Sequence, residues 1–285
     1  MARCLVAGCG YVGTALAVML RDAGHRVFGL KRRPAGLPEG VTPLAADLAD
    51  ANSLAAALAR IEAPLDVVVY AAAADHGDDA AYRRAYVDGL RNLVAALHAR
   101  DATPAGVFFT SSTAVYAQDD GSWVDESSPT EPGDFRGGRM LEAEAVLAAS
   151  GFPAVSLRLG GIYGPGRTRL VESVRSGRAT LRTGPPHFGN RIHRDDAAGA
   201  LAHLASLAIS GRALASLYLG WIASQLGMPE PAARDGEPAV GARDANRAAS
   251  NKRCSNARLR ATGYRFRFPT FREGYTEAIA ATTSR

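Results

Sequence analysis

The sequence predicts an α/β fold, a doubly wound parallel β-sheet with helices on both faces. Apolar runs of strand length alternate with amphipathic helical patterns through the first 160 residues. In addition, a glycine-rich turn joins the first apolar run to the first helical pattern. A strand, a helix and a second strand in this order form the right-handed unit from which parallel sheets are built.

The individual elements follow from these two periodicities. Buried strands are predicted over residues 4–7, 26–30, 66–71, 106–110 and 154–159, with a short strand at 42–45. Helices are predicted over residues 11–23, 51–61, 80–100 and 141–149, and another runs from Asp195 to about Leu207. Ligands of such sheets bind at the carboxyl ends of the strands, so the loops after the strands are the candidate sites.

The turn after the first strand has the pattern Gly-x-Gly-x-x-Gly. Gly8 permits the tight bend, Gly10 lets a pyrophosphate approach the backbone, and Gly13 lets the helix pack close to the strand. The helix begins at Tyr11 and Val12, where free N–H groups and the positive dipole end favour phosphate. The turn therefore predicts a dinucleotide site; the other interpretation is a glycine turn that only packs.

Three cations follow the second strand: Lys31, Arg32 and Arg33. An NAD site usually has an acidic residue here, which binds the ribose 2′-hydroxyl. A carboxylate would repel a 2′-phosphate, whereas a guanidinium group binds one with two parallel hydrogen bonds. The sequence therefore favours NADP as cofactor, with NAD as the alternative; a solvated basic turn is the interpretation without a ligand.

Two further loops belong to the predicted cofactor site. Asp47 and Leu48 follow the third strand, where the aspartate either caps the next helix or faces the adenine amino group. Ala71, Ala72 and Ala73 follow the fourth strand, and their small side chains either let a cofactor lie against the backbone or pack against a helix.

Composition excludes several classes of protein. The chain has 285 residues and a net charge of +5, and no apolar run approaches the roughly 20 residues of a membrane helix. Its three cysteines lack metal-ligand spacing, so no metal site is predicted, and a reducing cytoplasm is expected. Arginines crowd the C-terminal fifth, but nucleic-acid binding is the least favoured interpretation there, behind a solvated face or an anionic small molecule.

With these motifs in place, the sequence resembles the atypical or extended short-chain dehydrogenases/reductases of the NAD(P)-dependent epimerase/dehydratase type. The matching stretches, in the family's order, are residues 8–13, 46–48, 86–93, 110–116, 158–167 and 191–196. The resemblance implies a Rossmann domain over residues 1–160 and about 194–210. It also implies a substrate lobe over residues 161–193 and 211–285, a small-molecule substrate that is often a nucleotide-linked sugar, and a possible homodimer.

The family's chemistry uses a tyrosine as acid/base, a lysine that lowers its pKa, a serine or threonine that holds the substrate oxygen, and an asparagine. The resemblance places Ser112 at the serine position, with Ser111 beside the cofactor. Tyr86 stands at the asparagine position. Thr113 and Ala114 replace the Asp-Glu pair of the sugar dehydratases, so that a 4,6-dehydratase is not expected.

The Tyr-x-x-x-Lys pair is absent. One alignment puts Arg136 and Met140 at its two positions, and a slip of one residue puts Phe135 and Arg139 there. The nearest phenols that could substitute are Tyr116 and Tyr86, and the nearest cations are Arg136 or Arg139; packing roles are the alternative for both tyrosines.

On the substrate side, the candidates are Tyr163, Arg167 and His193. Arg167 resembles the family's phosphate-facing residue, with a solvated loop arginine as the alternative, and His193 either lines the cleft or caps the following helix. Residues 119–138 form a long polar loop, interpreted as a flap or a surface loop. The predicted function is an oxidoreductase or epimerase-like enzyme that binds NADP(H) and acts on a small oxygenated or nucleotide-linked substrate; the alternative is an NADP sensor without hydride chemistry.

Overall fold

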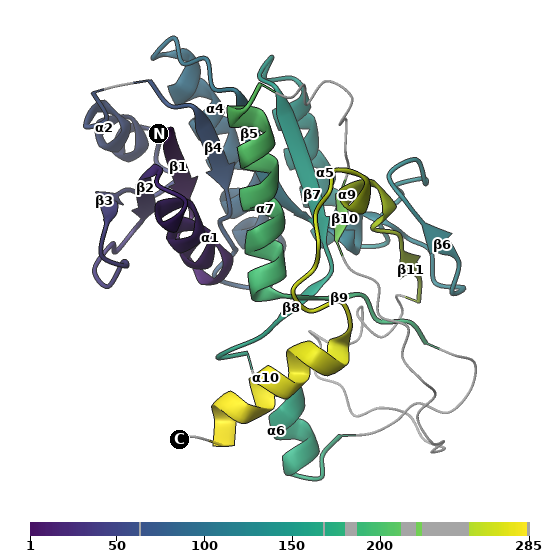
Figure 1. The fold of residues 1–285 in the computed structure, drawn as a ribbon. Helices are drawn as coiled ribbons and strands as arrows, with labels where there is room; N and C mark the ends of the chain where they lie inside the picture. Colours follow the sequence, from purple (N-terminus) through teal and green to yellow (C-terminus); the bar gives the residue numbers. More distant parts are fainter. Residues whose placement is uncertain (63, 168, 180–186, 212–220, 224–250, 284–285) are drawn as a thin grey trace.

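The computed structural model describes residues 1–285 except 63, 168, 180–186, 212–220, 224–250 and 284–285. Its centre is a seven-stranded sheet in the order β10-β7-β5-β4-β1-β2-β3, in which every pairing is parallel (Figure 1). The strands are β1 (Arg3–Ala7), β2 (Arg26–Lys31), β3 (Val41–Ala45), β4 (Val67–Tyr70), β5 (Gly106–Ser112), β7 (Ala154–Leu159) and β10 (Trp221–Ala223). The predicted doubly wound α/β fold is confirmed.

Helices cover both faces of the sheet and bury a core on each side. On one face lie α1 (Tyr11–Asp22) and α7 (Arg194–Ile209); on the other lie α2 (Ala51–Ala59), α4 (Gly89–His98) and α5 (Phe135–Ala148). Successive strand side chains point to opposite faces. Accordingly, Val6 packs into the core of α1 and α7, whereas Leu5 packs into the core of α2, α4 and α5.

The helix predicted over residues 80–100 is interrupted. It consists of α3 (Asp79–Tyr82), the π-helical segment η1 (Arg83–Asp88) and then α4. The Tyr70 hydroxyl donates a hydrogen bond to the Ala85 carbonyl, and a Cβ on Gly89 would lie 2.2 Å from that hydroxyl oxygen. A widened turn accommodates this buried phenol, so the helix predicted over residues 80–100 is present over residues 79–98 with a π-helical turn within it.

The helix predicted over residues 141–149 starts six residues earlier, at Phe135. The Asp134 carboxylate caps it by accepting the N–H groups of Arg136 and Gly137, at 2.9 and 3.2 Å. The loop before this helix is paired with a distant part of the chain. Within it, β6 (Trp123–Val124) pairs in parallel with β11 (Arg253–Cys254).

The remaining described elements gather beside the sheet (Figure 1). They are β8 (Gly161–Tyr163), α6 (Arg169–Arg175), β9 (Arg191–His193), α9 (Ala257–Ala261) and α10 (Phe271–Thr283). Tyr275 of α10 stacks on Tyr163, with ring centroids 4.4 Å apart. Among helices in the described ranges, none is both long and apolar enough to cross a membrane.

Candidate cofactor and substrate site

The three glycines of the first turn are in the environments that their predicted roles require. Gly8 has φ +98°, and a Cβ there would lie 2.4 Å from the Ala72 nitrogen. A Cβ on Gly13 would lie 2.2 Å from the Gly8 carbonyl oxygen, whereas one on Gly10 would meet nothing within 4 Å. Gly8 and Gly13 therefore serve close packing, and Gly10 leaves space above the helix N-terminus for a ligand.

Two guanidinium groups lie beside this turn. Arg167 covers the ring of Tyr11 at 4.1 Å and Arg194 approaches it at 5.4 Å, while the Tyr11 hydroxyl donates to the Pro165 carbonyl at 2.9 Å. Burial raises the pKa of Tyr11. The Val12 side chain is buried in the core that α1 and α7 form with the sheet. Arg194 is paired with Asp195 at 2.7 Å, so the charge of Arg167 is the one that adds to the N-terminal dipole of α1, an arrangement that favours phosphate.

Ion pairs occupy the region after β2, β3 and β4. The guanidinium of Arg32 donates to both carboxylate oxygens of Asp75, at 2.7 and 2.6 Å. Asp47 accepts a hydrogen bond from Arg84 at 2.7 Å and another from the Ala49 N–H at 2.9 Å. Burial alone would raise the pKa of Asp47, but these hydrogen bonds outweigh it and lower that pKa.

The other predicted cofactor residues surround these pairs. The Leu48 carbonyl accepts from Asn92 at 3.0 Å, and the Ala71 N–H donates to the Ala7 carbonyl at 2.8 Å. Ala72 and Ala73 follow Ala71 and lead to the cleft at Ala74. Lys31 and Arg33 flank Arg32 at the end of β2; Lys31 is half-buried and Arg33 is exposed.

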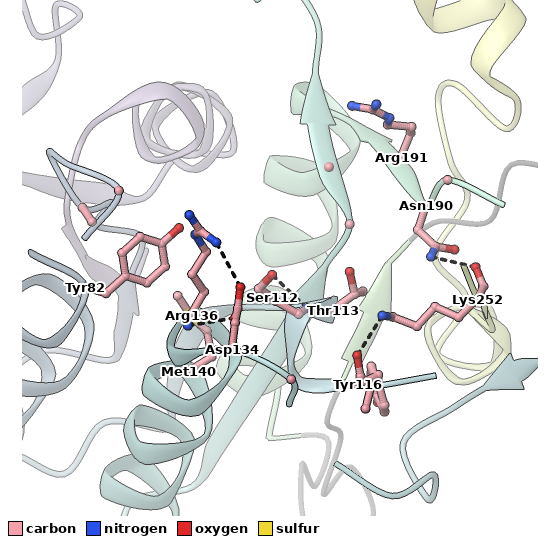
Figure 2. A pocket seen from close by; sticks show the side chains of 18 of the residues that line it. Tyr82, Ser112, Thr113, Tyr116, Asp134, Arg136, Met140, Asn190, Arg191 and Lys252 are labelled. Atoms are coloured by element: carbon pink, nitrogen blue, oxygen red, sulfur yellow. Dashed lines mark hydrogen bonds and ion pairs between the residues drawn. The ribbon is translucent and has the colours of Figure 1, made fainter. Parts of the chain in front are cut away.

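A cleft of about 950 Å³ lies beyond the ends of β4 and β5. Its lining includes five cationic side chains (Arg136, Arg167, Arg169, Arg191 and Lys252) and three carboxylates (Asp75, Asp119 and Asp134). Two histidines, His76 and His187, also line it. The excess of positive charge suits an anionic substrate. Figure 2 shows Ser112, Thr113 and Arg136 facing Asn190, Arg191 and Lys252 across this space.

Adjacent serines at the end of β5 have different surroundings. The Ser112 hydroxyl lines the cleft and accepts the Ala114 N–H at 3.1 Å, where it caps the short helix η2 (Thr113–Val115). The Ser111 hydroxyl donates to Glu144 of α5 at 2.6 Å. Consecutive strand residues alternate between faces, so Ser112 is the serine available to a substrate, and the Ser111 hydroxyl is bound to the helix layer.

The phenols considered as catalytic substitutes both line the cleft, and each makes hydrogen bonds within the protein. The Tyr116 hydroxyl accepts from Arg158 at 2.7 Å and donates to the Asp125 carbonyl at 2.8 Å, and the residue is 2% exposed. Burial raises the pKa of Tyr116 to about 12. The Tyr86 hydroxyl accepts the Ala74 N–H at 3.3 Å, and burial raises the pKa of Tyr86 as well. Proton transfer at neutral pH requires the opposite shift.

The two arginine alternatives are separated by the structure. Arg136 lines the cleft and pairs with Asp134 at 3.0 Å. Arg139 binds Asp79 through two hydrogen bonds of 2.7 and 2.8 Å and Glu142 through a third of 2.7 Å. Of these two arginines, Arg136 is therefore the one in the cleft, and Arg139 joins α5 to α3.

Of the predicted substrate residues, Arg167 lines the cleft, but Tyr163 and His193 lie under α10. Tyr163 is 4% exposed and stacks on Tyr275. His193 is 1% exposed, and its Nδ1 accepts the Asp195 N–H at 3.3 Å, which caps α7. The helix-capping interpretation of His193 thus fits the structure. Tyr163 packs the C-terminal helix against β8.

Lys252 lines the cleft but was not among the residues selected from the sequence. It is 2% exposed, and its Nζ donates to the Tyr116 carbonyl at 2.8 Å (Figure 2). Burial lowers the pKa of Lys252. Asn190 fixes this segment by donating to the Lys252 carbonyl and accepting the Cys254 N–H, each at 3.0 Å. These contacts span more than 60 residues, so no local pattern could have predicted them.

The strand, open glycine turn and basic cleft define a Rossmann-type α/β protein with a nucleotide-binding architecture. The family model that matches the sequence is that of the NAD dependent epimerase/dehydratase family, over residues 4–182, and the chain belongs to this family. No curated protein matches the sequence closely enough to count as a relative.

Solved structures are similar over nearly the whole chain. A protein from Methylobacillus flagellatus assigned to the NAD-dependent epimerases/dehydratases is 34% identical, with 99% of both chains covered and a TM-score of 0.75. Two more distant structures show the same fold. Bordetella bronchiseptica WbmG, solved with NAD and UDP, is 19% identical over 99% of this chain and 94% of its own, with a TM-score of 0.73. The Thermus thermophilus UDP-glucose 4-epimerase, solved with NAD, is 20% identical over 99% of both chains, with a TM-score of 0.71.

Proposed function

We propose that the chain is an NADP(H)-binding oxidoreductase or epimerase-like enzyme that acts on a nucleotide-linked sugar or a related oxygenated anion. The observation that carries this proposal is the open position at Gly10, beside Arg167 and the N-terminus of α1. A pyrophosphate placed there meets free N–H groups, the helix dipole and a guanidinium. Family membership supports the same assignment.

The remainder of the cofactor fits the loops beyond the strands. Lys31, Arg32 and Arg33 provide positive charge for a 2′-phosphate, and the adenine edge is assigned to Asp47. The nicotinamide end extends toward Ser112, at the carboxyl end of the neighbouring strand β5. When bound, the cofactor supplies hydride transfer, and the protein's part is to bind, orient and shield it.

On the substrate side, Ser112 would hydrogen-bond the reacting oxygen, and the cationic lining would hold a diphosphate. WbmG was solved with UDP, which supports a nucleotide-linked substrate for this cleft. The proton donor would differ from that of the Tyr-x-x-x-Lys enzymes. The Tyr116 hydroxyl donates its proton to the Asp125 carbonyl, and Tyr86, whose hydroxyl accepts the Ala74 N–H, has no lysine four residues further on. Lys252 and Arg136 are the cations that line the cleft near Ser112.

The second candidate function is an NADP sensor without hydride chemistry. It is favoured by the absent Tyr-x-x-x-Lys pair and by the raised pKa values of both remaining phenols. Such a protein would use the same cofactor site but would need no substrate in the cleft.

Calorimetric titrations with NADPH, NADP, NADH and NAD test the cofactor, and titrations with UDP and UDP-glucose test the cleft. The enzyme proposal expects NADPH and a sugar nucleotide to bind. For an oxidoreductase, mixing NADP with UDP-glucose should produce the absorbance of the reduced nicotinamide, because oxidation of a substrate hydroxyl transfers its hydride to NADP. Coenzyme binding without any nucleotide binding in the cleft would favour the sensor. Absence of binding by all four coenzymes would overturn both.

A further inference from the structure

Arg32 and Asp75 form an ion pair across the carboxyl edge of the sheet. Arg32 follows β2 and Asp75 follows β4, and β1 lies between these two strands. The pair therefore lies on either side of the strand that ends in the glycine turn. Two nearly equal hydrogen bonds, of 2.7 and 2.6 Å, join the two terminal nitrogens of the Arg32 guanidinium to the two carboxylate oxygens of Asp75.

This pairing uses the part of Arg32 that a phosphate would need. A guanidinium binds a carboxylate and a phosphate in the same way, through two parallel N–H groups. In a Rossmann site the adenosine ribose lies near the end of the second strand, where Arg32 stands. Asp75 also lines the cleft, so its carboxylate lies on the ligand side of the protein.

Asp75 also supplies the acidic group that β2 lacks. NAD-binding sites hold the ribose 2′-hydroxyl with a carboxylate at the end of that strand. Here Lys31, Arg32 and Arg33 take that place, and the carboxylate comes from the loop after β4. The neighbouring acid, Asp47, is already paired with Arg84 at 2.7 Å, so Asp75 is the carboxylate in direct contact with Arg32.

We propose that Asp75 is a second determinant of coenzyme choice: it competes with the 2′-phosphate of NADP(H) for Arg32 and accepts the 2′-hydroxyl of NAD(H). This inference rests on the proposed cofactor site. It implies that Asp75 reduces the preference for NADP(H) over NAD(H) that Lys31, Arg32 and Arg33 would produce by themselves. Arg32 and Asp75 side chains are 60% and 53% exposed, so water screens the pair and Arg32 can exchange one partner for the other.

The test is a calorimetric comparison of NADPH and NADH binding to the full chain and to Asp75→Asn. Adenosine 2′,5′-bisphosphate and adenosine 5′-monophosphate serve as fragment probes that isolate the 2′-phosphate. We expect Asp75→Asn to bind NADPH and the bisphosphate about three- to ten-fold more tightly, with NADH and the monophosphate unchanged or weaker. Arg32→Ala should abolish the gain when the two changes are combined.

Asp22→Asn is the matched control. Asp22 pairs with Arg21 at 2.7 Å in another surface Arg–Asp ion pair, with side chains 61% and 30% exposed, at the end of α1 remote from the glycine turn. This variant should leave both affinities unchanged. An unaltered NADPH-to-NADH ratio in Asp75→Asn, with both coenzymes still binding, would overturn the inference alone. If the unmodified chain bound neither coenzyme, the proposed function would fail, and the inference with it.

Discussion

The guanidinium of Arg158 on β7 donates to both carboxylate oxygens of Glu144 on α5, at 3.0 and 2.7 Å. Their side chains are only 10% and 13% exposed, so this is a nearly buried ion pair between the sheet and a helix. Ser111 donates to the same carboxylate, and Arg158 also donates to the Tyr116 hydroxyl. The pair thus fixes both ends of the segment that contains Ser112.

Glu144→Gln should lower the free energy of unfolding by about 3 kcal/mol or more, because it leaves the Arg158 charge buried without its counterion. Urea denaturation would measure the loss. Glu142→Gln is the control: that carboxylate lies two residues earlier in α5 and is 33% exposed, so its loss should cost less than about 1 kcal/mol. Equal effects for the two variants would contradict the assigned importance of the buried pair.

Substitutions at two glycines of the same turn should have different effects, one on stability and the other on coenzyme binding. Gly8→Ala should destabilise the protein by about 3 kcal/mol or more, because φ is positive and the new Cβ would collide with the Ala72 backbone. Gly10→Asp should fold, since the position is open and aspartate is a good helix N-cap, yet it should abolish coenzyme binding through its negative charge. Thermal unfolding and calorimetry would measure the two effects. Normal NADPH affinity in Gly10→Asp would refute the pyrophosphate position.

Arg136 and Arg139 should respond differently to truncation. Arg136→Ala should weaken binding of a nucleotide such as UDP by about ten-fold, because it removes a cation from the cleft, with little effect on stability. Arg139→Ala should leave UDP affinity unchanged and lower stability by about 1 kcal/mol, since it breaks the contacts of α5 with Asp79. If Arg139→Ala weakened UDP binding and Arg136→Ala did not, the alignment that places Arg139 at the lysine position would identify the functional cation.

His193 should make the protein less stable in acid. Burial lowers its pKa from the ordinary 6.5, so the folded state keeps the ring neutral while the unfolded state takes up a proton. The unfolded state therefore binds more protons as the pH falls below 6.5, and stability is lost in that direction. His193→Asn keeps an acceptor for the Asp195 N–H but does not titrate.

Urea midpoints at about pH 7 and about pH 5 would measure this effect, and the loss on acidification should be smaller in His193→Asn than in the unmodified chain. His76→Asn makes the same chemical change at an exposed position and should leave the loss unchanged. An acid sensitivity identical in all three proteins would show that other groups account for it.

Local patterns predicted the regular part of the fold and failed where a distant side chain intervenes. The five main strands were correct, since buried parallel strands are short apolar runs that chain neighbours alone identify. The helix predicted at residues 80–100 is present, but its π-helical turn was not predicted, because that turn depends on Tyr70 from β4, whose hydroxyl lies against Ala85 and Gly89. The early start of α5 has a local cause, the Asp134 cap, which the sequence analysis overlooked.

Sequence motifs likewise predicted only some of the residues of the candidate site. Ser112 and Arg167 were identified by motifs and do line the cleft, whereas Tyr163 was selected by its motif but packs beneath α10. Lys252 and Asp75 were not selected, because the roles of these side chains depend on contacts across 136 and 43 residues. The substrate lobe predicted over residues 161–193 and 211–285 lies partly outside the described residues.

The sequence by itself determined the parallel sheet and the glycine turn, because strand periodicity and positive-φ bends are properties of a few adjacent residues. Only the tertiary structure decided which charged groups share the cleft and which are neutralised. Electrostatic interactions depend on distance in space, and folding brings Arg32 to Asp75, Arg158 to Glu144 and Lys252 to Tyr116 from separate parts of the chain.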